Sequence, residues 1–127
     1  MKVQRWVGSL MVAAATGITA FAESYVWDGG GTNDNWDTAE NWSPDGGVPV
    51  SASDTTVTLD GNVRPGPVQN VAAPFLLNRL EFLNGGATKP AWNLTGSALQ
   101  VVTNGDVQPR FYLTRAATCT LSTPIEI

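Results

Sequence analysis

The sequence predicts an all-β protein whose short strands form a parallel β-solenoid, and three observations support this fold class. Strand-like patches recur along the chain, turn signals such as Asn84-Gly85-Gly86 and Asn104-Gly105-Asp106 separate them, and no window shows sustained helical periodicity. Apolar pairs also recur at intervals of about twenty residues, the length of one coil in a solenoid: Leu80 and Phe82, Leu99 and Val101, and Leu121 and Ile125. A small antiparallel β-sandwich fits the same strands and turns and stays open as the alternative.

Residues 1–22 have the pattern of a secretory signal peptide. Lys2 and Arg5 precede an apolar run, and the segment ends in Ala20-Phe21-Ala22, with small residues where signal peptidase reads the chain. Glycines and hydroxyl side chains interrupt the apolar run, which disfavours a membrane anchor. We therefore predict export, cleavage next to Glu23, and a mature chain of 105 residues (127 − 22) without a membrane span.

The composition of the mature chain excludes several classes of function. Five basic residues face eleven acidic ones, a formal charge of −6 that disfavours binding to nucleic acid or to anionic lipid. The sequence contains no histidine, which excludes Ser-His-Asp and Cys-His nucleophilic systems and histidine-ligated metal sites within the chain. A glycosidase-type carboxylate pair remains as a distant enzymatic alternative, drawn from Asp28, Asp37, Glu40, Asp54, Asp60 and Glu81. We predict a non-enzymatic protein with no catalytic residues.

Residues 23–63 form a segment rich in Trp, Gly and Asp, which we interpret as an N-terminal cap. Trp27, Trp36 and Trp42 stand among turn-forming residues that cannot build a regular helix. If Asp37 caps one helical turn over residues 38–41, the spacing of six places Trp36 and Trp42 against different neighbours. The three indoles either pack as a cap over the first strands or form a platform on which sugars stack.

Polar residues of the same segment suggest two ligands. Beside a sugar platform, Asn33, Asp34 and Asn35 would accept hydrogen bonds from hydroxyl groups. Calcium is the one cofactor that the chemistry allows, with weak candidate ligands in Asp34, Asn35, Asp37 and Glu40. Their spacing matches no EF-hand or nonapeptide calcium repeat, so turn formation is the favoured role and the predicted metal site is none.

Alternating β-branched and apolar residues predict the strands that follow. Residues 54–60 form the first of them, with Thr55, Val57 and Leu59 on one face. Residues 64–127 then supply the solenoid rungs, with strands predicted over residues 78–83, 91–95, 98–102, 110–114 and 119–127. Cys119, the single cysteine, lies in the last of these and is expected to act as a small buried apolar residue. If the C-terminal edge is exposed, the thiol could instead join two chains.

Several of these motifs resemble the opening of large bacterial surface proteins. They are Trp27-Asp28-Gly29-Gly30, Asn35-Trp36-Asp37, Asn41-Trp42-Ser43, Val48-Pro49 and Asp54-Thr55-Thr56-Val57. The resemblance is to proteins with autotransporter-associated β-strand repeats and to PEP-CTERM-type passenger proteins, and it covers residues 25–127. Leu59 departs from it, because that pattern often has an aromatic residue there.

The resemblance implies a right-handed parallel β-helix that is exported across a Gram-negative envelope and displayed at or released from the cell surface. It also implies a structural or adhesin-like role, with polysaccharide or surface matrix as the partner. Residues 121–127 read as a strand with an open apolar edge, so we expect either continuation in a longer chain or self-association through the C-terminal strand. The alternative function is a carbohydrate-binding module that uses Trp27, Trp36 and Trp42.

Overall fold

The computed structural model describes residues 22–43, 46–83, 90–114 and 118–127. Within these ranges the chain is all-β, with eleven short strands and a single turn of 3-10 helix, η1 (Ala39–Asn41). The predicted fold class is therefore confirmed at the level of an all-β protein. The predicted signal peptide lies outside the described residues except for Ala22, and the described part holds no helix long and apolar enough to cross a membrane.

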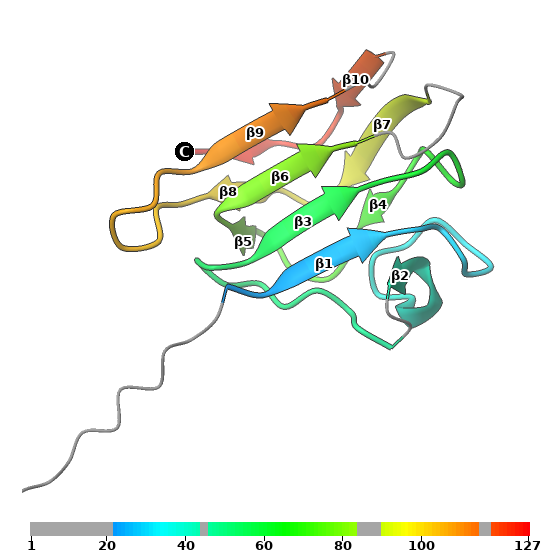
Figure 1. Cartoon of the computed structure of the whole chain (residues 1–127), viewed down its shortest axis with the longest axis horizontal. Helices are drawn as coiled ribbons and strands as arrows, with labels where there is room; N and C mark the ends of the chain where they lie inside the picture. Colours follow the sequence, from blue (N-terminus) through cyan, green and yellow to red (C-terminus); the bar gives the residue numbers. More distant parts are fainter. Residues whose placement is uncertain (1–21, 44–45, 84–89, 115–117) are drawn as a thin grey trace, which may run out of the picture.

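Ten of the eleven strands pair in parallel, and they form three sheets (Figure 1). The largest sheet contains β1 (Ser24–Trp27), β3 (Thr56–Leu59), β6 (Arg79–Phe82) and β9 (Arg110–Leu113), side by side in that order, and β2 (Trp42–Ser43) adds an antiparallel edge beyond β1. The second sheet contains β4 (Val68–Gln69), β7 (Ala91–Gly96) and β10 (Thr118–Leu121). The third contains β5 (Phe75–Leu77), β8 (Leu99–Val101) and β11 (Ile125–Glu126).

From β3 onward, the chain visits the three sheets in a fixed order. We call one such passage a round: β3, β4 and β5 form the first, β6, β7 and β8 the second, and β9, β10 and β11 the third. Each strand pairs in parallel with its counterpart in the next round, and the crossover that a parallel pair requires runs through the other two sheets. The antiparallel β-sandwich is therefore wrong, because β1 and β2 form the one antiparallel ladder between described strands.

The pairing of residues between neighbouring rounds explains why the sequence does not show a repeat of constant length. Paired residues in neighbouring rounds are about 23 to 31 positions apart, as in the pairing of Thr56 with Arg79 and of Arg79 with Arg110. The apolar pairs expected at intervals of about twenty residues are therefore not all equivalent. Leu80 lies in the largest sheet, Leu99 in the third and Leu121 in the second, although Leu99 does stack directly on Ile125. The loops between strands differ in length, so the sequence has no constant period.

Inward-facing side chains from the three sheets form one apolar core. Alternation along the strands directs Val57 and Leu59 of β3, and Leu80 and Phe82 of β6, into the same interior. The core consists of the buried residues Trp27, Trp36, Trp42, Val57, Leu59, Phe75, Leu77, Leu80, Phe82, Trp92, Leu94, Leu99 and Val101. The tryptophan segment and the repeated strands thus share a single core, because the segment contributes three of its members.

A buried glutamine fixes the corner between the second and third sheets. The Gln69 side chain donates to the carbonyl oxygens of Ala72, Ser97 and Ala98 at 2.8, 3.0 and 3.1 Å, and its oxygen accepts from two backbone N–H groups. Gly96 packs directly on this residue, with φ +107° and a Cβ position only 2.2 Å from the Gln69 carbonyl oxygen. Only glycine fits there, since any side chain would collide with the backbone of the neighbouring round.

Candidate functional site

The three tryptophans of the N-terminal segment pack against one another inside the protein. Each is 0% exposed. Trp42 lies opposite Trp27 across the β1–β2 ladder, with ring centroids 5.2 Å apart at 85°, and 5.5 Å from Trp36 at the same angle. Trp36 also contacts Phe75 of the third sheet edge to face, at 5.2 Å. These are the preferred geometries for aromatic pairs, so the cluster joins β1, β2, the intervening loop and β5.

Trp36 and Trp42 have different further neighbours, as expected, but the two rings also contact each other, which the spacing did not predict. A single 3-10 turn between them reverses the chain, and the Trp42 indole N–H then donates to the Trp36 carbonyl oxygen at 2.8 Å. The predicted helical turn over residues 38–41 exists as η1, but Thr38 rather than Asp37 occupies the N-cap position. The Thr38 hydroxyl donates to Asn33 instead of capping the turn.

An internal hydrogen-bond network occupies the polar groups that were candidates for sugar binding. The buried Asn41 amide donates to the carbonyl oxygens of Asn33 and Asn35, both at 2.9 Å, and accepts from the Gly31 N–H at 2.9 Å. The Asn33 side chain accepts from the Asn35 N–H at 2.9 Å. These contacts bind the Asn33 side chain and the backbone of residues 31, 33 and 35 within the loop.

The calcium candidates are spread around the same loop. Asp34 forms an ion pair with Arg64 at 3.3 Å, and the backbone N–H of Asp37 donates to Asn70. Glu40 lies in η1 on the exposed side. Across the described ranges, Asp, Glu and Cys side chains form no group of three or more that could hold a metal ion. The structure thus separates these carboxylates instead of gathering them.

Two of the carboxylates considered for a glycosidase pair do line one surface pocket. Asp28 and Asp60 border a hollow of about 280 Å³ together with Val26, Ser43 and Asn62. An oxygen of Asp28 accepts from the Gly30 N–H at 2.9 Å, and an oxygen of Asp60 accepts from the Gly61 N–H at 2.7 Å. Both contacts are typical of acidic residues that stabilise tight turns.

The N-terminal end of the molecule is covered at the edge of every sheet. In the largest sheet, β2 pairs with β1. In the second, residues 34–36 cover β4, with Val68 N–H donating to the Asp34 carbonyl oxygen at 2.7 Å and Trp36 N–H donating to the Val68 carbonyl oxygen at 3.0 Å. In the third, residues 51–52 cover β5 through two contacts with Leu76. Among the described residues, the outermost strand at this end is therefore the two-residue β2, and the edges of β4 and β5 are covered by loop segments.

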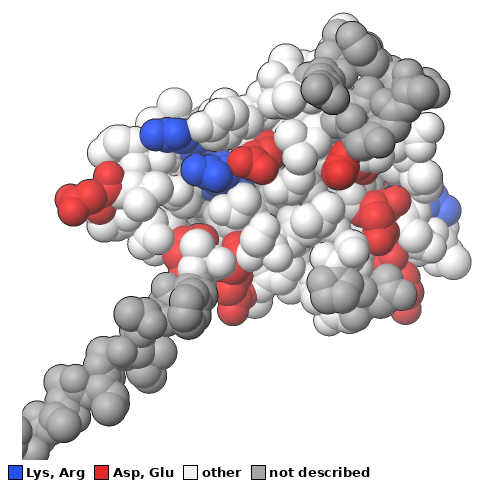
Figure 2. All heavy atoms as spheres, in the orientation of Figure 1, with Lys and Arg blue, Asp and Glu red and all other residues white. Residues whose placement is uncertain are grey.

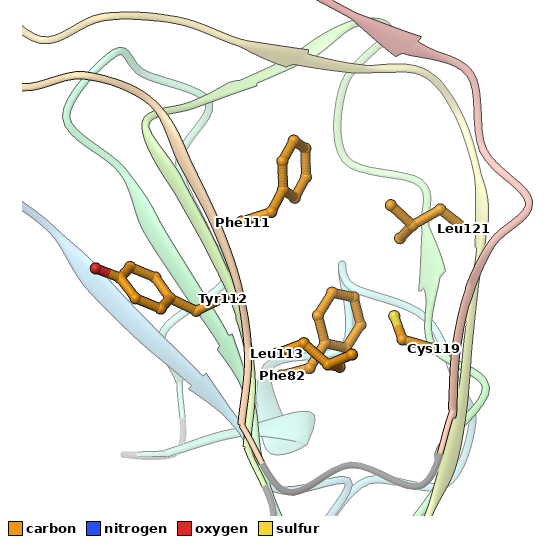
Figure 3. Close-up of a pocket in the computed structure, with 6 residues that line it drawn as sticks. All are labelled: Phe82, Phe111, Tyr112, Leu113, Cys119 and Leu121. Atoms are coloured by element: carbon orange, nitrogen blue, oxygen red, sulfur yellow. The ribbon is translucent and has the colours of Figure 1, made fainter.

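The C-terminal end has the opposite character. Strands β9, β10 and β11 are the outermost members of their sheets, and within the described ranges no strand pairs with their outer edges. An open apolar cavity of about 150 Å³ lies at this end, lined by residues of β6, β9 and β10. Figure 3 shows Phe82, Phe111 and Leu113 pointing into it from one wall and Cys119 and Leu121 from the opposite wall, while Tyr112 points outward. We call Phe111, Leu113, Cys119 and Leu121 the open-end residues.

Exposure changes abruptly along one column of stacked side chains. Trp27, Leu59, Phe82 and Leu113 lie opposite one another on successive strands of the largest sheet. Their exposed fractions are 0, 0, 3 and 59%. All four side chains belong to the same interior column, so Leu113 is exposed because none of the described residues covers it rather than because it points outward.

The outer face of the same sheet carries a small cluster of charges and one aromatic ring. The Arg79 guanidinium lies 5.3 Å from the centre of the Tyr112 ring and 3.3 Å from Glu81, and Arg110 donates to the Tyr112 hydroxyl at 2.8 Å. Figure 2 shows two basic groups side by side next to an acidic group at the upper left of this face, and acidic groups elsewhere on it. These contacts link β6 to β9 and are worth little individually at the surface.

Cys119 lies where the apolar core meets the open end. Its side chain is partly buried, packs against the core and lines the cavity. Burial raises the pKa of its thiol, because the apolar surroundings disfavour the charged thiolate. The thiol is thus less reactive than an ordinary cysteine, which fits the expected role of a small apolar residue.

Taken together, the geometry defines an all-β protein with parallel sheets, one closed end and one open apolar end. Comparisons of the chain with protein-family models, with curated proteins and with solved structures gave no match. The candidate functional surface is therefore identified from this structure alone. It is the open end, and not the tryptophan cluster that the sequence singled out.

The sequence pointed to only part of that surface. Residues 119–127 were expected to form one strand with an open edge, but they divide between β10 and β11, which lie in different sheets and are each outermost among the described strands. Phe111 and Leu113 were missed, although their alternation with Arg110 and Tyr112 is visible in the sequence. That alternation predicts a strand with one apolar face, but the same pattern occurs in β3 and β6, where the apolar face is buried.

Proposed function

We propose that this chain is an exported, non-catalytic module of the bacterial cell surface, with a structural or adhesin-like role. In this proposal the three sheets are the first coils of a right-handed parallel β-helix, residues 23–63 cap its start, and residues 64–127 supply its rungs. The partners would be a surface polysaccharide or matrix and a further protein at the open end. The resemblance of residues 25–127 to autotransporter-associated and PEP-CTERM-type surface proteins motivates the assignment.

The contrast between the two ends is the observation that carries the proposal. A parallel stack with repeated strands has two terminal edges, and each must be covered if the protein is not to associate through it. Here one end is covered in all three sheets, whereas the other exposes strand edges and the apolar interior. This is the design expected of a module that begins a stack and is joined by something at its far end.

The absence of histidine and the state of the acidic residues support a non-catalytic role. The sequence contains no histidine, which removes the most common general base and the commonest nucleophile-activating group. The two carboxylates that share a pocket, Asp28 and Asp60, each hold a turn through a backbone N–H. Neither arrangement suggests a reacting group.

The burial of the tryptophans supports the cap over the sugar platform. A stacking platform needs a ring face that a pyranose can reach, whereas Trp27, Trp36 and Trp42 are each 0% exposed and pack edge to face on other rings. A carbohydrate-binding function through these residues would require the loop to open. That alternative predicts that Trp36→Phe, which preserves an aromatic core residue, weakens retention on a glycan panel.

Export and processing provide the first test of the proposed function. The full chain is expressed in a Gram-negative host, and its location and N-terminus are determined by fractionation and mass spectrometry. We expect an N-terminus at or next to Glu23 in the periplasmic, surface or medium fraction. The matched variant Ala22→Asp should accumulate unprocessed, because signal peptidase needs a small residue there. Wild-type chain that stays in the cytoplasm with Met1 intact would overturn the proposal.

A further inference from the structure

We propose that the open end is the interface of a two-fold symmetric dimer, in which β9 pairs antiparallel with β9 of a second copy. The inference rests on the proposed function, because it takes the open end to be the surface through which the module associates. The occupant of this end must satisfy two needs at once. It must pair the free edges of β9, β10 and β11, and it must cover Phe111, Leu113 and Leu121, which are 45, 59 and 37% exposed.

A second copy of the chain can pair the free strand edges and cover the apolar side chains at the same time only if it binds through its own open end. Its N-terminal end offers only the outer edge of the two-residue strand β2, since the segments 34–36 and 51–52 cover the other two sheets on that side. Its open end offers three free edges and an apolar interior of the same shape. Identical surfaces that complement each other define a closed two-fold contact, so association stops at two copies.

The three-sheet arrangement is compatible with such an axis. A two-fold axis that lies just beyond the outer edge of β9, level with the middle of that strand and at right angles to the stacking direction, reverses the course of the second copy. It therefore brings β9 against its own counterpart, β10 against β11 of the second copy and β11 against its β10, and every one of these pairs is antiparallel. All three free edges are then paired in a single step.

The alternation within β9 selects the register. Antiparallel pairing of identical strands about a two-fold axis places one residue opposite itself, and residues directly opposite share a face. An axis at Tyr112 sets Phe111 opposite Leu113 of the second copy, twice, on the interior side. An axis at Phe111 would instead leave Leu113 opposite Pro109. We therefore infer the register that centres on Tyr112, which points outward (Figure 3).

The distribution of charge allows two negatively charged copies to meet at this end. Residues 23–60 contain eight of the eleven acidic residues and none of the seven basic ones. Strands β9, β10 and β11 carry one basic residue, Arg110, and one acidic residue, Glu126. Apposition of the open ends therefore keeps the acidic segments of the two copies at the far ends of the dimer, where salt screens their repulsion.

Sedimentation equilibrium of the mature chain, residues 23–127, tests the inference. Wild type should reach the mass of two copies and no more, and Leu113→Asp should shift the dissociation constant upward by at least tenfold. Val50→Asp is the matched control, because Val50 is 54% exposed and lies outside the open end, and it should dimerise like wild type. A wild type that stays monomeric, or that grows beyond two copies, would overturn the dimer.

Circular dichroism separates failure of this inference from failure of the proposed function. A β-rich monomer rejects the dimer but leaves the capped module in place, whereas a wild type without β structure rejects both. Cross-linking then checks the register. In a Cys119→Ser background, Tyr112→Cys should be joined to its own copy by a short bis-maleimide. Thr56→Cys, on β3 in the middle of the same sheet and two strands away from β9, should not. Equal cross-linking of both variants would exclude pairing through β9.

Discussion

The two ends of this protein are built from the same kind of strand and differ in almost everything that governs association. At the N-terminal end, β2 and two loop segments cover the sheet edges, and tryptophan rings fill the interior. At the open end, edges and interior are both exposed. Leu59 and Leu113 illustrate the difference. They lie in the same column of inward-facing side chains in the largest sheet, but Leu59 is 0% exposed and Leu113 is 59% exposed. Position along the stack, and not residue type, decides whether a leucine in this column is buried or exposed.

The largest expected effect comes from deleting a ring at the covered end. Trp42→Ala should lower the free energy of unfolding by about 3–5 kcal/mol, because it removes a fully buried ring that contacts Trp27, Trp36 and Tyr25. Phe111→Ala at the open end should cost less than about 1 kcal/mol at low protein concentration, since half of its ring is already in water. Urea unfolding of both variants measures the contrast. Equal losses would mean that the two ends do not differ in packing.

A buried amide at the covered end should give the next largest effect. Asn41→Leu leaves the Gly31 N–H and two carbonyl oxygens without their partner, and we expect a loss of about 2–3 kcal/mol. Asn93→Leu is the control, since Asn93 is exposed on β7 and accepts one hydrogen bond from Ser122. Its change should stay within about 0.5 kcal/mol. Thermal unfolding in parallel would test this, and a tolerant Asn41 would show that the loop does not depend on its network.

Alkaline pH should lower the free energy of unfolding modestly. One titrating group near each end of the protein causes this loss, Tyr25 at the covered end and Cys119 at the open end. Burial raises the pKa of the Cys119 thiol, and burial together with the hydrogen bond to Glu23 raises the pKa of Tyr25. Both groups are favoured in their neutral form by folding. Their contribution to the stability of the folded state is therefore fully present at pH values below the ordinary pKa values of about 8.5 for the thiol and 10 for the phenol. It is lost as the pH rises through the higher pKa values of the folded state.

Unfolding curves between pH 8 and 11 provide the measurement. Wild type should lose stability over this range, Cys119→Ser should remove the earlier part of the loss and Tyr25→Phe the later part. Iodoacetamide should also modify Cys119 more slowly at pH 8.5 than it modifies free cysteine. A thiol that reacts as fast as free cysteine would contradict its partial burial.

The smallest effect is expected from the surface ion pairs. Asp34→Asn breaks the contact with Arg64 at the covered end, and Glu81→Gln breaks the contact with Arg79 nearer the open end. Their side chains are between 21 and 47% exposed, so each change should cost less than about 1 kcal/mol and less still in high salt. Melting at low and high ionic strength measures both. A loss of several kcal/mol at either site would mean that charge, and not packing, distinguishes the ends.

The sequence was informative where local chemistry decides the outcome. Alternation of apolar residues with Thr, and glycine-rich turns between the patches, were enough to predict short strands and an all-β class. The three tryptophans were correctly expected to matter. Their contact was not foreseen, because it depends on one 3-10 turn that reverses the chain between Trp36 and Trp42.

Register and exposure lay beyond the sequence for a different reason. Loops of unequal length separate the paired strands, so residues that stack on one another, such as Thr56, Arg79 and Arg110, do not recur at a fixed interval. The exposure of Phe111 likewise depends on what lies beyond β9 and not on β9 itself. The pattern of residue types along the sequence therefore predicts neither the strand register nor the exposure of these side chains.

The pairing of each round with the next has a consequence for how the chain acquires its structure. Every ladder in the sheets joins segments that follow each other closely in the sequence, and no described ladder connects the first strand directly to the last. A chain that emerges from a secretion channel with its N-terminus first can therefore close its tryptophan cluster and add strands one at a time, without waiting for residues still inside. If the chain is exported as proposed, folding and translocation would then proceed in the same direction.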